Sequence, residues 1–175
     1  MKFKTVLLFA LALIFSCTIK THLDLAKGFY KKLKSESLED LLKTEYGTRG
    51  NVEVWTYYLN LKYDSTYNWL YDPQKDSFSL RKDSNYALFK KEVSDPIKFV
   101  RNLKDKKDRL RITSISNSPW PSHFVKFWFS NLDALIFNPE EFQIDSDSKK
   151  QWMNEFKSCE PIDKNWVYFN LRKQD

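Results

Sequence analysis

Cysteine and histidine are the side chains best suited to nucleophilic catalysis, and this chain of 175 residues has two of each. A nucleophile needs a base beside it, and the pair to consider is Cys159 with His123, because His22 lies close to the N-terminal segment. No local motif surrounds either member of the pair. We therefore interpret Cys159 as a partly buried residue at the end of a helix and assign no catalytic residue.

Metal-ligating side chains do not occur at the spacings that a bound ion needs. The histidines form no H-x-x-x-H pair and the cysteines form no C-x-x-C pair. Residues 138–147 gather Glu140, Glu141, Asp145 and Asp147, but they lack the alternating order and the turning glycine of a calcium loop. Three glycines in the whole chain also exclude the glycine-rich loops that hold nucleotide phosphates. We predict no metal and no other cofactor.

Residues 101–111 form the most basic stretch, with six cations against two aspartates. A patch of this kind can bind the phosphates of lipid headgroups or of nucleic acid. Cations also complement the dipole at a helix C-terminus, and the interleaved aspartates weaken the field. We predict a solvated turn, with an anion or headgroup patch as the alternative. The residues of that patch are Lys104, Lys106, Lys107, Arg109 and Arg111.

The stretch NSPWPSHF, residues 117–124, holds Trp120 between two prolines. A rigid tryptophan suits a stacking contact with a sugar or with a side chain of a partner, so Trp120 and His123 form a candidate binding loop. The simpler interpretation is that Trp120 folds back over the end of a sheet, and we predict this second arrangement.

An apolar run of ten residues, 6–15, follows a short basic start and ends at Ser16-Cys17. As a helix it is about 15 Å long, whereas a bilayer core is about 30 Å thick. A basic start, a short apolar run and small polar residues are the layout of a signal peptide. The pattern predicts that residues 1–16 are removed.

The segment Ile14-Phe15-Ser16-Cys17 resembles the lipobox of bacterial lipoproteins. The resemblance implies that a diacylglycerol is attached to the sulfur of Cys17 and that cleavage occurs just before this residue. Residues 17–22 would then be a lipidated tether. The resemblance also implies the periplasmic side of an outer membrane, because Thr18 rather than aspartate follows the cysteine. The alternative is an ordinary secreted protein, in which a Cys17–Cys159 disulfide can form.

Residues 23–175 are long enough for one globular domain that needs no stabilising cross-link. Aromatic residues make up 17% of the chain and gather in strand-like segments. This indicates a sheet core rather than an exposed sugar- or lipid-binding face. Helical spacing and capping signals predict helices over 23–34 and 38–46, from Asp95-Pro96 onward, and over 147–158. Alternating or aromatic-rich segments predict strands over 51–63, 66–72, 77–82, 86–93, 109–116, 123–130, 133–137 and 165–172.

This order of elements predicts an α+β fold, an antiparallel sheet of five or more strands with helices packed on one face. The residues predicted to be buried are Trp55, Leu59, Leu61, Phe127, Phe129, Phe156 and Phe169. The function that fits best is a non-enzymatic envelope lipoprotein. It would contact the membrane through its lipid anchor and bind an unidentified protein or small ligand, but no nucleic acid. The alternative is a membrane-anchored or secreted hydrolase.

Overall fold

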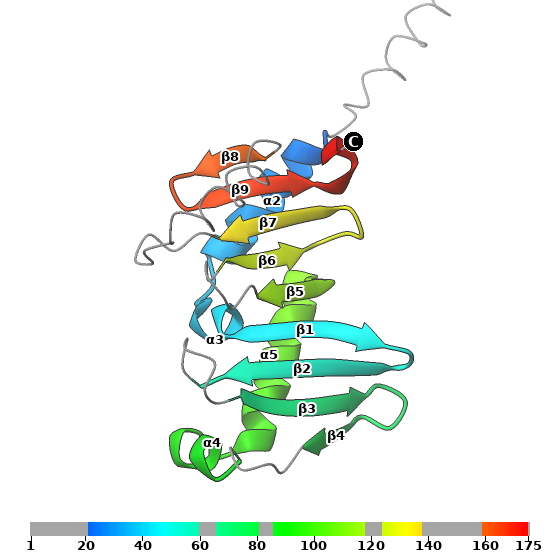
Figure 1. The fold of residues 1–175 in the computed structure, drawn as a ribbon, viewed down its shortest axis with the longest axis vertical. Coiled ribbons are helices and arrows are strands. Elements are labelled where there is room, and N and C mark those ends of the chain that lie inside the picture. The colour runs from blue at the N-terminus through cyan, green and yellow to red at the C-terminus, as the bar shows by residue number, and fades with distance from the viewer. Residues whose placement is uncertain (1–20, 60–65, 81–85, 118–123, 138–158, 175) are drawn as a thin grey trace, which may run out of the picture.

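The computed structural model describes residues 21–59, 66–80, 86–117, 124–137 and 159–174 (Figure 1). Nine antiparallel strands form one sheet in the order β4-β3-β2-β1-β5-β6-β7-β9-β8. The strands are β1 (Thr44–Arg49), β2 (Val52–Tyr58), β3 (Thr66–Asp72), β4 (Ser77–Leu80), β5 (Ser114–Asn117), β6 (Val125–Trp128), β7 (Asp133–Phe137), β8 (Glu160–Asp163) and β9 (Trp166–Asn170). The predicted α+β class is confirmed.

Two long helices lie on the same side of the sheet (Figure 1). Helix α5 crosses the strands near the middle of the sheet, and α2 lies along the half that contains β7 and β9. The described helices are α2 (His22–Lys34), α3 (Glu39–Leu42), α4 (Tyr86–Glu92), α5 (Pro96–Leu110) and the 3-10 helix η1 (Leu171–Gln174).

Both long helices begin at side chains that cap free backbone N–H groups. Thr21 and Asp24 form a reciprocal capping box at the start of α2. Asp95 accepts a hydrogen bond from the backbone of Lys98, and Pro96 occupies the first turn of α5, as the sequence predicts. The capping box makes His22 the first residue of α2. The prediction that residue 22 belongs to a tether is therefore wrong.

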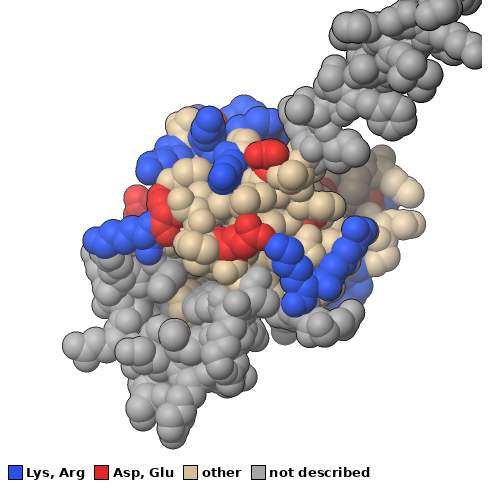
Figure 2. All heavy atoms as spheres, turned by 90° about the horizontal axis from the view of Figure 1, so that it is seen from above, with Lys and Arg blue, Asp and Glu red and all other residues tan. Residues whose placement is uncertain are grey.

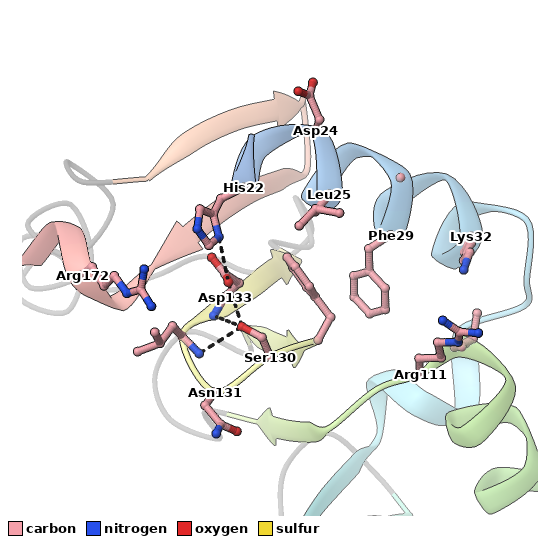
Figure 3. A pocket seen from close by; sticks show the side chains of 14 residues that line it. His22, Asp24, Leu25, Phe29, Lys32, Arg111, Ser130, Asn131, Asp133 and Arg172 are labelled. Carbon is pink, nitrogen blue, oxygen red and sulfur yellow. Dashed lines mark hydrogen bonds and ion pairs between the residues drawn. The ribbon is translucent and has the colours of Figure 1, made fainter. Parts of the chain in front are cut away.

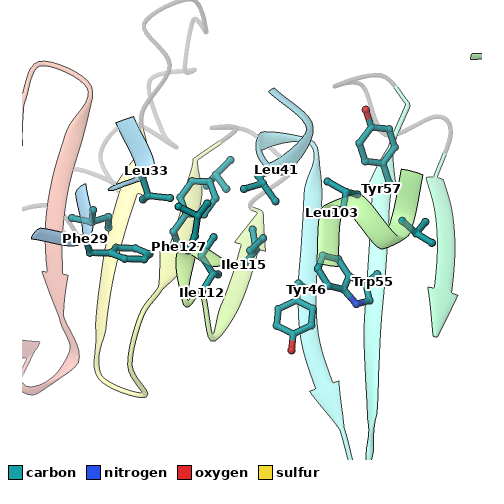
Figure 4. Packing of buried hydrophobic residues seen from close by; sticks show 14 of the residues in the cluster. Phe29, Leu33, Leu41, Tyr46, Trp55, Tyr57, Leu103, Ile112, Ile115 and Phe127 are labelled. Atoms are coloured by element: carbon teal, nitrogen blue, oxygen red, sulfur yellow. The ribbon is translucent and has the colours of Figure 1, made fainter. Parts of the chain in front are cut away.

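The core lies between the helices and one face of the sheet (Figure 4). Tyr46, Trp55 and Trp69 stand opposite one another on β1, β2 and β3, and the two indoles stack at 5.8 Å. Trp55 and Phe127 are fully buried, as predicted. These aromatic side chains are core residues, because the strand alternation turns them toward α5 and α2.

The predicted burial of Phe169 is also confirmed, but in a second cluster. Phe169 packs there with Phe124, Ala134 and Ile136, whose strand positions alternate with those of the main core. Leu59 and Phe129 are half-buried. The predictions for Leu61, Phe156 and the helix 147–158 lie outside the described residues.

Two predicted elements have the wrong structure. Residues 86–92 form helix α4 rather than a strand, and Phe89 stacks 3.7 Å from Tyr67. The aromatic composition of residues 86–92 favours a strand, but the contacts that Phe89 makes with the core favour a helix. The predicted helix over 38–46 ends at Leu42, because residues 44–49 pair with β2 as strand β1. Gly47 therefore lies in a strand, opposite Val54, and ends no helix.

The prediction of a solvated turn over residues 101–111 is also wrong, because helix α5 continues to Leu110. Val100, Leu103, Lys107 and Leu110 are all buried, and their spacing is that of one helix face. A lysine at the core-facing position 107 interrupts the apolar stripe in the sequence. The helix itself is not interrupted there.

Candidate functional site

A pocket of about 770 Å³ opens between α2, the turn from β6 to β7 and the C-terminal end of α5 (Figure 3). We call it the α2 pocket. Its walls are one face of α2 from His22 to Lys32, residues 129–133, and residues 110–111, with Arg172 of η1 at the rim. This volume is within the range of small-molecule sites.

Helix α2 supplies an apolar wall. Gly28 and Phe29 follow Leu25 by three and four residues, and Lys32 follows them by four and three, which places all four on one face. The Phe29 ring packs 4.7 Å from the ring of Phe129 on the opposite wall. Leu25 is 48% exposed, so the wall contains apolar surface that the described part of the chain does not cover.

Asp133 is the buried ionisable group of the pocket, with 5% of its surface exposed. Its carboxylate accepts hydrogen bonds from Tyr168 Oη and Asn170 Nδ2, both at 2.6 Å, and from Ser130 Oγ at 2.7 Å. Burial opposes ionisation, but these donors outweigh it and hold the pKa of Asp133 below its ordinary value. Burial and the neighbouring carboxylate raise the pKa of Tyr168 to about 12.

His22 is the fourth partner of this carboxylate. Its Nδ1 lies 3.3 Å from Asp133 Oδ2, and its side chain is 53% exposed. The imidazole is therefore oriented by a carboxylate while Nε2 remains for another partner. The sequence alone did not identify this pair, because the two residues are 111 positions apart. The Thr21-x-x-Asp24 capping signal is enough to place His22 in a helix.

Ser130 closes the turn and does not form a nucleophile–base pair. Its Oγ donates to Asp133 and accepts hydrogen bonds from the backbone N–H groups of Leu132 and Asp133 (Figure 3). In a serine hydrolase, the histidine lies between the serine and the carboxylate. Here the carboxylate of Asp133 lies between Ser130 and His22, so within the described residues no imidazole contacts the serine hydroxyl.

Three cations line the pocket: Lys32, Arg111 and Arg172. All three side chains are exposed, and within the described segments none of them pairs with a carboxylate. Arg111 ends α5 in the left-handed conformation, at φ 60°. Lys32 and Arg111 lie at one end of the apolar wall, whereas Asp133, His22 and Arg172 lie at the other (Figure 3).

The other residues of the predicted anion patch are engaged within the fold. Lys104 pairs with Asp108 at 2.6 Å, Lys106 donates to the carbonyl of Ser37, and Arg109 pairs with Glu36. Arg101, which precedes them on α5, pairs with Asp76. Of the predicted patch, Arg111 alone lines the α2 pocket.

Lys107 is buried, with 6% of its surface exposed. Its Nζ lies 2.7 Å from Asp108, 3.1 Å from Tyr46 Oη and 3.6 Å from Glu53. Burial disfavours the charged amine, but these partners outweigh burial and raise the pKa of Lys107. Lys107 therefore connects α5 to the sheet and does not face an external ligand.

Charge is mixed on the end of the molecule that carries α2, β8 and β9. Lysine and arginine side chains stand around the rim of this end, and acidic side chains lie between them (Figure 2). Net charge on this surface therefore does not mark a site. The α2 pocket differs from it because its three cations lie at the two ends of an exposed apolar wall (Figure 3).

The remaining predicted site residues do not lie in the pocket. Cys17, Trp120 and His123 are outside the described residues. Cys159 is half-buried and packs against the cluster that contains Phe124 and Phe169. Within the described segments, no three histidine, cysteine or acidic side chains come together as metal ligands.

No helix in the described segments is long and apolar enough to cross a membrane. Comparison of the chain with protein-family models, with curated protein sequences and with solved structures finds no match to any of them.

Proposed function

We propose that this protein is a lipid-anchored, non-enzymatic binding protein of the bacterial cell envelope and that the α2 pocket holds a small ligand. The observation that carries the proposal is the pocket itself. It combines about 770 Å³ of space, an apolar wall on α2 and three cations without carboxylate partners among the described residues. Convergent polar groups around a mostly apolar cavity are typical of ligand sites.

The polar groups in the pocket support binding rather than catalysis. Asp133 already accepts hydrogen bonds from Tyr168, Asn170 and Ser130, so it has little capacity left to accept a proton from a substrate. The Ser130 hydroxyl is used in closing the turn. Both groups hold the walls of the pocket in place.

The position of the pocket suits a membrane-anchored protein. Cys17, the proposed lipid attachment site, is four residues before Thr21, and four extended residues span at most about 14 Å. His22 belongs to the pocket wall. A domain anchored at Cys17 would therefore hold the α2 pocket close to the bilayer, where its ligand would be taken up or delivered.

A hydrolase is the second candidate, and one observation favours it. The imidazole of His22 is oriented by Asp133 and exposed at the pocket, as a base that activates water would be. We expect no turnover of ester, phosphoester or glycoside substrates by the purified protein. Turnover that His22→Gln abolishes, while the exposed-surface variant Lys27→Gln retains it, would establish the hydrolase instead.

The lipid anchor is tested by mass spectrometry of the protein purified from its own envelope. We expect an N-terminal peptide that begins at Cys17 and carries the added mass of acyl chains. Cys17→Ser should release the protein from the membrane, whereas Cys159→Ser should leave it bound. An unmodified N-terminus, or membrane retention of Cys17→Ser, contradicts the anchor.

The ligand pocket is tested separately by native mass spectrometry and extraction of small molecules from the same protein. The test variant is Gly28→Leu, because a Cβ atom at Gly28 meets no atom within 4 Å and Gly28 lines the pocket. We expect a small molecule to accompany the wild-type protein and to be absent from Gly28→Leu. A ligand retained by Gly28→Leu would place the binding site elsewhere.

A further inference from the structure

We infer that the α2 pocket binds a free, single-chain amphiphilic anion, a carboxylate or phosphate head on one apolar chain. The inference rests on the proposed function and adds the chemical class of the ligand. It further assigns the head group to the end of the pocket formed by Lys32 and Arg111, and the apolar chain to the wall formed by Leu25 and Phe29.

The apolar chain is assigned from the exposed surface of the wall. Leu25 is 48% exposed, and its apolar surface is continued by Phe29, Phe129 and Leu132, which line the same space. An exposed leucine elsewhere on the surface needs no explanation, but here it adjoins the buried Phe29 and the half-buried Phe129 and Leu132 inside a concave site. A ligand with an apolar chain would cover Leu25, whereas a fully polar ligand would leave it in contact with water.

The negative head is assigned from the cations at one end of the wall. Lys32 and Arg111 face the pocket together, and the two acids that line it, Asp24 and Asp133, lie toward its other end (Figure 3). The low pKa of Asp133 keeps its carboxylate charged, which opposes an anion near Arg172. An arginine and a lysine on one side of a pocket suit a carboxylate or phosphate.

Arg111 pairs with no carboxylate among the described residues, whereas four basic residues of α5 do. Arg101, Lys104, Lys107 and Arg109 each pair with a carboxylate of the chain. Arg111 ends the helix in the left-handed conformation, and its side chain belongs to the pocket lining. A glycine is the usual residue at such a position, so an arginine there carries a side chain at the expense of backbone strain.

The test is isothermal titration of the full chain carrying Cys17→Ser, so that no attached acyl chain competes. The probes are decanoate, decyl phosphate and decyltrimethylammonium, each below its micelle concentration, and octanoate. We expect micromolar binding of both anions and no binding of the cation. Octanoate should bind roughly tenfold more weakly than decanoate, because two methylenes are removed from the apolar contact.

Variants then assign the two ends of the pocket, each with a matched control. Lys32→Gln and Arg111→Gly should each weaken decanoate binding at least threefold, whereas Lys31→Gln, which alters the neighbouring exposed lysine on α2, should change it less than twofold. Leu25→Gln should weaken binding about tenfold, whereas Leu88→Gln, at an equally exposed leucine of α4, should not. Arg111→Gly relieves the steric strain of the left-handed backbone at this position, so we expect the variant to fold. A loss of affinity then reports the loss of the arginine side chain.

Three results would overturn the inference. Decyltrimethylammonium binding as tightly as decanoate would remove the anionic head. Binding to phosphatidylglycerol vesicles without binding of monomeric decanoate would replace the free ligand by a membrane surface. A co-purified ligand of another class that Gly28→Leu loses would refute the ligand class while leaving the proposed binding function intact. Absence of any ligand in both experiments would refute the two together.

Discussion

The imidazole Nδ1 of His22 lies 3.3 Å from the Oδ2 atom of Asp133, and this contact joins the first turn of α2 to the first residue of β7. Asp133 is itself fixed by Tyr168 and Asn170 of β9. Asp133 is therefore one of the residues that attach α2 to the C-terminal half of the sheet, beside the Phe29–Phe129 contact, and the α2 pocket lies next to this attachment.

Asp133→Asn should lower the free energy of unfolding by about 1–3 kcal/mol at neutral pH, because the amide turns a donor toward the donors that surround it. The pKa of Asp133 is lower in the folded state than its value of 3.8 in the unfolded chain. Its contribution is therefore complete above about pH 4 and is lost as the pH falls through the folded pKa. Urea denaturation at several pH values should show the two proteins converging in acid. A constant difference down to pH 2 would contradict this account.

Lys107→Met should destabilise the fold by about 2–4 kcal/mol, because it leaves Glu53 and Tyr46 beside α5 without their cation. The raised pKa of Lys107 means that its contribution is complete below about pH 10 and is lost as the pH rises through the folded value. Thermal denaturation measures the change. Arg109→Gln, which breaks the exposed pair with Glu36, is the control and should alter stability little. Equal effects of the two variants would contradict the assigned burial of Lys107.

Gly28→Ala should stabilise the protein by about 0.5–1 kcal/mol. Gly28 lies inside helix α2, and a methyl group there meets no atom within 4 Å. Gly50→Ala should have the opposite effect by a similar amount, because Gly50 has φ 61° in the turn between β1 and β2. Chemical denaturation of both variants gives the comparison. A loss of stability in Gly28→Ala would show that another group fills the space into which the methyl group points.

Arg111→Gly should raise the free energy of unfolding by about 0.5–1 kcal/mol, because glycine adopts the left-handed conformation at the end of α5 without steric strain. Arg111→Ala keeps that strain and removes the same charge, so it should be no more stable than the wild type. The unfolding midpoints in urea separate the two effects. Stabilisation by both variants would assign the effect to the charge rather than to the backbone.

The sequence predicts well those elements whose signals are local. The capping residues before α5 and the apolar spacing of α2 locate both helices, and the alternation around Trp55 locates a core strand. Strand β1 was missed because Tyr46 continues the helical spacing of Leu41 and Leu42, whereas its pairing with β2 places Tyr46 in a strand. The extent of α5 was underestimated because Lys107 is a charged residue at a core position. Its partners Tyr46 and Glu53 lie on other elements, and Asp108 was predicted to be solvated.

The candidate site was less predictable than the fold. His22, Asp133 and Arg172 come from the beginning, the later part and the end of the sequence, and the fold alone brings them together. None of them lies in a motif that identifies a reaction. The sequence features that do exist concern local structure rather than chemistry. A capping box places His22 in a helix, and Ser130 closes a turn of the chain.

The order of strands divides the sheet into two continuous stretches of chain. Strands β1 to β4 are consecutive, as are β5 to β9, and the two groups meet where Tyr46 of β1 pairs with Ile115 of β5. Most pairings within each group are hairpins that close short loops, and the β7–β9 pairing closes a longer one. The Tyr46–Ile115 pairing closes the longest stretch of chain and must overcome the largest loss of chain entropy. We therefore expect each group to form its hairpins early and the central seam to form late, with α5, which crosses it, bringing the two groups together. The rate of folding of the whole chain would then depend on this one seam.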